Sequence, residues 1–308
     1  MFRNVRLFRL HGAWPDSEQA VSEKLSAAAF EPCGSFAETS TGFEPPTGDA
    51  AGLLARRVEN ADLLKLRSQT RILPAAAVED ALEARVVQWR ERMGAEPGRR
   101  ELRKLKAQLR DELLPKAFLR SQRTSALVLV PERILAIDSL SDARTETFIN
   151  TLRTALDDFD AVPLGFARPV PDLLTRIFLG DAPRGFALGT ECRFVDPSDT
   201  RASIRCTELD LTDATLRTHL RHGMRLTQLG ISFDEVLSCT LDEKGGIAKL
   251  KLLGADLPED LPEEDPLARL DAGIALLAGT LRRLLAALAQ ALGGYEEREG
   301  VPERLAVA

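Results

Sequence analysis

The sequence predicts an α+β fold with a protruding helical hairpin. Residues 63–67 and 126–137 have the short apolar runs of strands, whereas 75–114 and 266–292 carry apolar residues at helical spacing. The length of 308 residues suggests roughly two globular cores. We divide the chain into a central α+β domain, a hairpin tip and a C-terminal α+β domain. Their bounds are 1–74 plus 115–165, 75–114 and 166–308.

The central domain begins with a strand at 2–10 and a helix at 17–30. A stretch rich in Gly, Pro, Ser and Thr at 32–51 predicts a loop, and 63–67 a second strand. Two apolar runs, 126–130 and 134–137, flank a short turn and predict a β-hairpin. A helix over 142–156 follows. The proline-rich segment 162–171 marks the domain boundary.

The C-terminal domain alternates short helices and strands. We expect helices at 173–179 and 212–222, strands near 193–195 and 203–206, and a meander of strands at 225–229, 236–240 and 247–253. An acidic linker, 256–265, precedes the last helix. That helix begins with Asp265 as N-cap and Pro266 at the first position, and it ends at Gly293-Gly294.

The segment 75–114 has the clearest pattern in the chain. The helix over 75–93 and the next one, 99–114, are separated by Gly94-Ala95-Glu96-Pro97-Gly98. The second helix carries one stripe of leucines and, turned by about 100°, one stripe of cations. Two such helices bury their apolar stripes against each other and project from the body. The leucines are Leu102, Leu105, Leu109 and Leu113, and the cations are Arg99, Arg103, Lys106 and Arg110.

Charge is strongly segregated along the chain. Residues 85–123 hold twelve Lys/Arg and five acids, which gives +7 in a chain of net charge −6 and leaves −13 for the remainder. A basic face on an acidic protein indicates a polyanionic partner, most often nucleic acid. A solvated helical face that keeps the hairpin soluble is the alternative interpretation.

Catalytic motifs are absent from the sequence. It contains no phosphate-binding glycine loop and no nucleophile elbow. His219 and His222 lie three residues apart on a predicted helix, but no Cys, Asp or Glu is arranged around them for a metal. Four cysteines are widely spaced and predict buried, reduced thiols. We therefore expect a non-enzyme without cofactor or metal.

The sequence also predicts an intracellular location. The N-terminus meets charge too soon for a signal peptide, and no run of 18 uncharged apolar residues suggests a membrane span. We expect a cytoplasmic protein with no membrane partner.

Several short motifs resemble those of the RdgC family of recombination-associated proteins, in the same order along nearly the whole chain. They are 2–10 (FRNVRLFRL), 29–35 (AFEPCGS), 42–46 (GFEPP), 71–74 (RILP), 113–118 (LLPKAF), 162–164 (VPL) and 292–294 (LGG).

This resemblance implies a horseshoe-shaped subunit that pairs at both ends into a ring-shaped homodimer. The ring would encircle double-stranded DNA without sequence preference and restrain the RecA recombinase, as a nucleoid-associated protein. The hairpin would be a tip where two subunits meet, with Phe118 at a position that matters in the family and Trp89 nearby. Glu208 and Leu209 would belong to the opposite contact.

The chain departs from the family pattern after the strand at 203–206. A basic and amide run in many members is here Thr207-Glu208-Leu209-Asp210-Leu211, and later basic positions are His222-Gly223-Met224 and Thr227-Gln228. The lining of the ring would then differ, or would come from Arg217 and other cations. Together, charge and resemblance give these DNA-binding candidates: Arg85, Arg90, Arg99, Arg100, Arg103, Lys106, Arg110, Lys116, Arg120, Arg123, Arg221, Arg225, Lys249 and Lys251.

A function of another class stays open beside DNA binding. The basic hairpin would dock an acidic protein partner if the chain is a structural or adaptor protein, and the acidic linker could satisfy the hairpin within a dimer.

Overall fold

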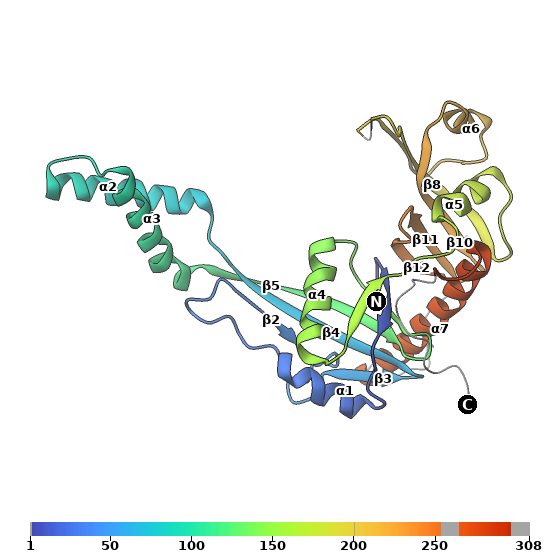
Figure 1. The fold of residues 1–308 in the computed structure, drawn as a ribbon, viewed down its shortest axis with the longest axis horizontal. Coiled ribbons are helices and arrows are strands. Elements are labelled where there is room, and N and C mark those ends of the chain that lie inside the picture. The colour runs from blue at the N-terminus through green and yellow to red at the C-terminus, as the bar shows by residue number, and fades with distance from the viewer. Residues whose placement is uncertain (1, 200, 254–264, 297–308) are drawn as a thin grey trace.

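The fold is α+β, as the sequence predicts. The computed structural model describes residues 2–199, 201–253 and 265–296, and within them it has two antiparallel sheets and seven α-helices (Figure 1). The predicted acidic linker lies outside the described residues except for Asp265.

The first sheet is built from the central part of the chain and has the strand order β2-β4-β5-β6-β1-β7, with β3 also paired to β4. The predicted hairpin at 126–137 is confirmed as the pairing of β5 with β6. The predicted loop at 32–51 is wrong in part, because β2 lies within it and pairs with β4. The strands are β1 Arg6–His11, β2 Thr39–Phe43, β3 Ala55–Val58, β4 Ala61–Ile72, β5 Phe118–Leu129, β6 Ile134–Ile137 and β7 Asp160–Pro163.

Two helices cover one face of this sheet. Helix α1, Glu18–Leu25, and helix α4, Asp142–Ala155, bury their apolar sides against it. The rings of Phe43 and Phe148 meet edge to face, with centroids 5.7 Å apart.

The second sheet has the order β12-β11-β10-β8-β9, so the predicted meander is confirmed. Helix α5, Val170–Leu179, packs on its apolar face, and α6, Ala214–Arg221, lies at the far end of the molecule (Figure 1). The strands are β8 Phe186–Val195, β9 Ser203–Cys206, β10 Arg225–Phe233, β11 Leu237–Asp242 and β12 Ile247–Leu252.

The last helix, α7, Pro266–Leu292, joins the two sheets. Its buried leucines share one core with Leu127 of the first sheet and Phe194 of the second. Asp265 accepts hydrogen bonds from the N–H groups of Leu267 and Ala268, which confirms the predicted N-cap. By length and mean hydropathy α7 is the one described helix that could cross a membrane, but buried core helices meet the same criterion. Its burial against both sheets makes it a core helix here.

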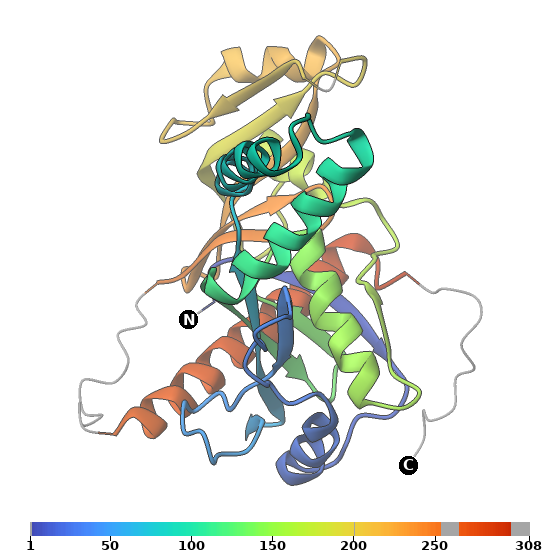
Figure 2. The same cartoon turned by 90° about the vertical axis from the view of Figure 1, so that its left-hand side faces the viewer.

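A two-stranded ribbon carries the hairpin away from this core. Strands β4 and β5 pair over twelve positions, from Ala61 with Leu129 to Ile72 with Phe118. The sequence predicts strands only at 63–67 and 126–130, because the distal halves are polar. Beyond the ribbon, α2 (Ala75–Met93) and α3 (Arg99–Leu113) form the predicted antiparallel hairpin, which stands clear of the body in Figure 1 and points toward the viewer, in front of the body, in Figure 2. Leu105 and Leu109 are buried between the helices.

The junction between ribbon and hairpin is organised by Arg71. Its guanidinium group donates hydrogen bonds to carbonyl oxygens in the turn that ends the hairpin and in the loop after Pro32. Because carbonyls from two separate segments share one cation, Arg71 fixes the direction in which the hairpin leaves the ribbon. The acceptors are Cys33, Gly34, Leu114, Pro115 and Ala117.

We predict that Arg71→Met loosens this junction and costs about 2 kcal/mol of local stability, since several carbonyls lose a charged donor. Hydrogen exchange should accelerate at the N–H of Ala117 and through the first turn of α2. Arg120→Met is the matched control, because Arg120 is exposed on the same ribbon and has no ion pair among the described residues. Equal exchange in the two variants would contradict the assignment.

Candidate nucleic-acid interface

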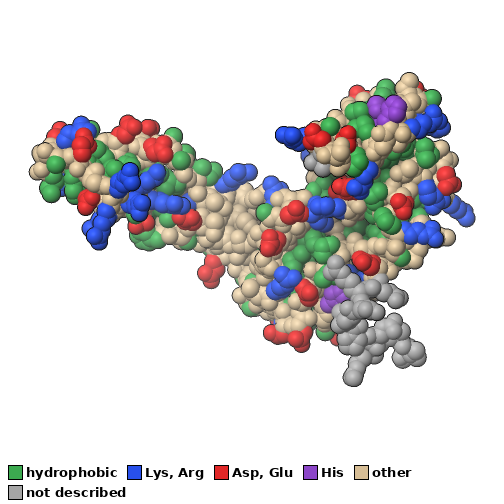
Figure 3. Space-filling view, turned by 45° about the horizontal axis from the view of Figure 1, so that its top comes forward, with side chains coloured by type: hydrophobic (Ala, Val, Ile, Leu, Met, Phe, Trp, Pro, Cys, Tyr) green, Lys and Arg blue, Asp and Glu red, His purple; other side chains and the backbone are tan. Residues whose placement is uncertain are grey.

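The cationic stripe of α3 lies on the outside of the hairpin. Arg99, Arg103, Lys106 and Arg110 are all exposed, and Figure 3 shows Lys and Arg side chains gathered along this arm. Within the described residues Arg99 and Arg103 form no ion pair. Lys106 lies 3.8 Å from Glu79, and Arg110 lies 2.7 Å from Glu38. The stripe therefore keeps both free and paired cations facing solvent.

The other predicted cations of the hairpin and ribbon also divide into those that form an ion pair and those that form none. Arg85 is 2.8 Å from Glu112, and Arg123 is 2.6 Å from Glu44. Arg90 pairs with Glu96. Three more are exposed and without an ion pair in the part of the chain that is described: Arg100, Lys116 and Arg120.

A second group of cations lies on the polar face of the second sheet, the face opposite α5. Lys249 and Lys251 are exposed on β12, and Arg225 begins β10. The predicted Arg221 does not belong to this group: it is exposed at the end of α6, which packs through Leu216 and His219 on the apolar face. Arg225 is 3.4 Å from Glu243. Because α5 occupies the other face, this polar face looks toward the open side of the molecule, across from the hairpin (Figure 1).

The carboxylate of Glu191 neutralises part of the positive charge of this face by pairing with Lys249. Burial opposes its ionisation, but bonds from Lys249 and Thr240 outweigh burial and hold the pKa of Glu191 below its usual range. Lys249 is thus already held by a carboxylate, whereas Lys251 is free of ion pairs among the described residues.

Two arginines of this face were missed by the sequence reasoning. Arg193 on β8 and Arg205 on β9 are direct cross-strand partners. The sequence could have predicted them from the alternation of polar and apolar residues in Arg193-Phe194 and Arg205-Cys206. This alternation places both arginines on the polar face of the sheet. The face therefore holds more cations than the predicted set.

The predicted dimer-contact residues lie at two distant places. Phe118 is 86% exposed, next to its strand partner Ile72 and to Leu119, which are 45% and 44% exposed. Phe118 is therefore not part of the core of the subunit. Trp89 is half-buried on α2, about 20 Å along the helix from its first residue. Glu208 and Leu209 lie beyond β9, at the other end of the molecule.

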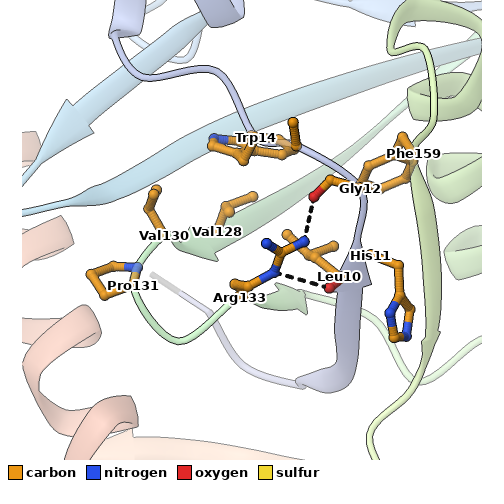
Figure 4. Close-up of a pocket in the computed structure, with 10 residues that line it drawn as sticks. Leu10, His11, Gly12, Trp14, Val128, Val130, Pro131, Arg133 and Phe159 are labelled. Carbon is orange, nitrogen blue, oxygen red and sulfur yellow. Dashed lines mark hydrogen bonds between the residues drawn. The ribbon is translucent and has the colours of Figure 1, made fainter. Parts of the chain in front are cut away.

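Catalytic chemistry has little support in the described residues. They hold no cluster of three or more His, Cys, Asp or Glu side chains suited to a metal. The ring of His219 packs 5.6 Å from that of Phe194. A cavity of about 230 Å³ is lined by Trp14, Phe159 and Arg133 (Figure 4). The guanidinium of Arg133 donates hydrogen bonds to the carbonyls of Leu10 and Gly12. These bonds tie the turn between β5 and β6 to the end of β1, which gives Arg133 a structural role.

Comparison with known proteins places this architecture in a family. The family described as "Putative exonuclease, RdgC" matches residues 1–295. A "Recombination-associated protein RdgC" of Shewanella oneidensis is 30% identical over 304 residues, which are 97% of this chain and 99% of the relative. Proteins of the same name from Xanthomonas oryzae and Laribacter hongkongensis are 34% identical. They cover 94% and 96% of this chain, and 97% and 99% of their own lengths.

The chain belongs to the RdgC family. The predicted resemblance is thereby confirmed over nearly the whole chain. The family description and the relatives' names differ on activity, since one refers to an exonuclease and the others to recombination. The expectation of a non-enzyme stays a prediction.

We expect the purified protein to release no nucleotides from linear duplex DNA in Mg²⁺ or Mn²⁺, because metal-dependent nucleases cluster acidic ligands around their ions. Acid-soluble release from end-labelled duplex measures this. A release that scales with protein and survives further purification would show exonuclease activity instead. It would then be mapped by replacing Glu191, Asp242 and Glu243 with the corresponding amides.

Proposed function

We propose that this RdgC-family protein binds double-stranded DNA without sequence preference as a ring-shaped homodimer, and that it restrains RecA during homologous recombination by occupying DNA. The observation that carries the proposal is the pair of exposed basic surfaces on the hairpin and on the second sheet. They lie on two sides of one open space (Figure 1), in a chain of net charge −6.

Phosphate contacts suit these surfaces. Sequence-independent binding draws its affinity from Lys and Arg at the backbone of the duplex, with little need for readers of base edges. Single-strand binding relies on exposed aromatic platforms. Aromatic residues make up only 5% of this chain, which favours a duplex as the ligand.

Ring closure is supported by the positions of the apolar surface. The patch of Phe118, Ile72 and Leu119 lies at the hairpin junction, and Leu209 is exposed at the other end of the subunit. A twofold axis makes each contact between identical surfaces, so two such contacts at opposite ends close a dimer into a ring. The horseshoe and ring remain part of this proposal. A nucleoid-associated, cytoplasmic location follows from it.

A structural or adaptor role is the second candidate. Arg85, Arg90, Lys106 and Arg110 each already contact a carboxylate in the subunit. The hairpin cations therefore accept acidic side chains as partners, and an acidic protein surface could replace them.

We predict that affinity for a random duplex falls steeply with salt, with a log–log slope of several units. Replacing Arg99, Arg103, Lys106 and Arg110 with Ala should lower that slope by about 0.9 for each lost phosphate contact. A charge-matched control replaces Lys24, Arg153, Arg176 and Arg201, which are on α1, α4, α5 and the β8–β9 turn. Fluorescence anisotropy at several salt concentrations measures both variants.

Three outcomes separate the candidates. A lower slope in the stripe variant alone supports phosphate contact by the hairpin. Equal slopes in stripe variant, control and wild type remove the stripe from the DNA site. An absence of binding at low salt overturns the DNA proposal and favours the adaptor role.

We predict that Phe118→Ala weakens self-association and leaves the free energy of unfolding within about 0.5 kcal/mol, because the side chain is exposed. Leu105→Ala, on the buried side of the same hairpin, should cost about 2–5 kcal/mol. Sedimentation with and without duplex, at two salt concentrations, measures the fraction of dimer. Thermal unfolding measures the stability of each variant. Unchanged self-association in Phe118→Ala would place the subunit contact elsewhere.

A further inference from the structure

Two of the four cysteines meet in the second sheet, although they are distant in sequence and form no motif. Cys192 on β8 and Cys206 on β9 are direct cross-strand partners. Direct partners point to the same face of a sheet, and both side chains pack against the shared core.

The spacing of this pair suits a covalent bridge. Directly opposed residues in antiparallel strands have Cα atoms about 4.5–5.5 Å apart. Disulfides accept Cα separations of about 4.4–6.8 Å, so a directly opposed pair lies within the range that a bridge can span. The two thiols already interact, since burial and the neighbouring Cys206 thiol raise the pKa of Cys192 to about 12.

The two cysteines differ in access. Cys192 is 2% exposed, whereas Cys206 is only half-buried, on the edge strand of the sheet. Cys33 and Cys239 are buried and have no cross-strand cysteine partner in the described residues. Cys206 is therefore the thiol that a small molecule reaches first.

We propose that Cys192 and Cys206 form a dithiol site that small-molecule disulfides, such as glutathione disulfide, oxidise to an intramolecular bridge. The Cys206 thiolate attacks one sulfur of the reagent, whose S–S bond breaks and releases one thiolate. Cys192 then loses its proton to solvent and attacks the Cys206 sulfur, which expels the second thiol. Two protein thiols are oxidised, and one disulfide molecule is reduced to two thiols.

Proximity makes the second step feasible. Burial keeps Cys192 protonated and slows its attack, but an aligned neighbour acts at a very high effective concentration. The mixed disulfide on Cys206 is therefore short-lived in the wild type and persistent when Cys192 is absent.

The bridge would fasten the edge strand β9 to β8. The chain leaves β9 through Thr207 to Glu208 and Leu209, and the N–H of Leu209 donates to the carbonyl of Thr190, 3.1 Å away on β8. Oxidation would thus hold this segment in place. The inference does not depend on DNA binding or on ring closure.

The test is incubation of the folded full chain with glutathione disulfide at pH 8, followed by acid quenching, alkylation, intact mass and peptide mapping without reduction. We expect the wild type to lose two of its four free thiols, without a retained adduct, and dithiothreitol to restore them. Cys192→Ala should retain one glutathione on Cys206, and Cys206→Ala should retain none. Cys33→Ala, which removes a buried cysteine in the loop before β2, should bridge like the wild type.

The outcomes decide the proposal. Four alkylatable thiols in the wild type after prolonged incubation would overturn it, as would a bridge that maps to another pair of cysteines. Loss of thiols from Cys206→Ala at the wild-type rate would overturn it as well. If Cys192→Ala fails to fold, the wild-type map and Cys206→Ala still decide.

Discussion

The twelve-pair ladder between β4 and β5 is the constraint on which the rest of the structure depends. Its inner half lies in the core, but its outer half is largely exposed and is held by backbone hydrogen bonds, by β2 on one side and by the carbonyls gathered at Arg71. A hairpin with so few buried side chains could not fix its own direction. The ladder and Arg71 supply that direction, and the hairpin supplies the cations.

The strand register of each sheet places two arginines directly opposite each other. Arg67 faces Arg123 across the ladder, and Arg193 faces Arg205 in the second sheet. Direct cross-strand pairs of like charge are destabilising. Glu44 offsets the first pair, with carboxylate oxygens 3.7 Å from Arg67 and 2.6 Å from Arg123. A single carboxylate only partly offsets two arginines, so a polyanion that brings phosphates to both surfaces would relieve a repulsion built into the fold.

The sequence predicted what local pattern controls and missed what long-range pairing controls. Helix α2 has the predicted bounds, because its apolar spacing and its glycine stop are local. Strand β2, Thr39–Phe43, is polar and becomes a strand only by pairing with β4. The cationic stripe was predicted in full, but Arg205 was missed because the sequence does not reveal that β9 pairs with β8 and brings Arg205 opposite Arg193. The meeting of Cys192 with Cys206 depends on strand register, which spacing along the chain does not reveal.

Strand β5 carries residues for both the proposed subunit contact and the proposed DNA contact. Phe118, at the proposed subunit contact, begins the strand, and Arg120 and Arg123 follow it toward the core. Because side chains alternate between faces, Phe118 and Arg120 share one face while Arg123 lies on the other. A slip of one residue against β4 would exchange these faces and separate Arg123 from Glu44. The register that places the aromatic ring for a partner subunit therefore also places the cations for phosphate, so closure of the dimer and contact with DNA depend on the same ladder.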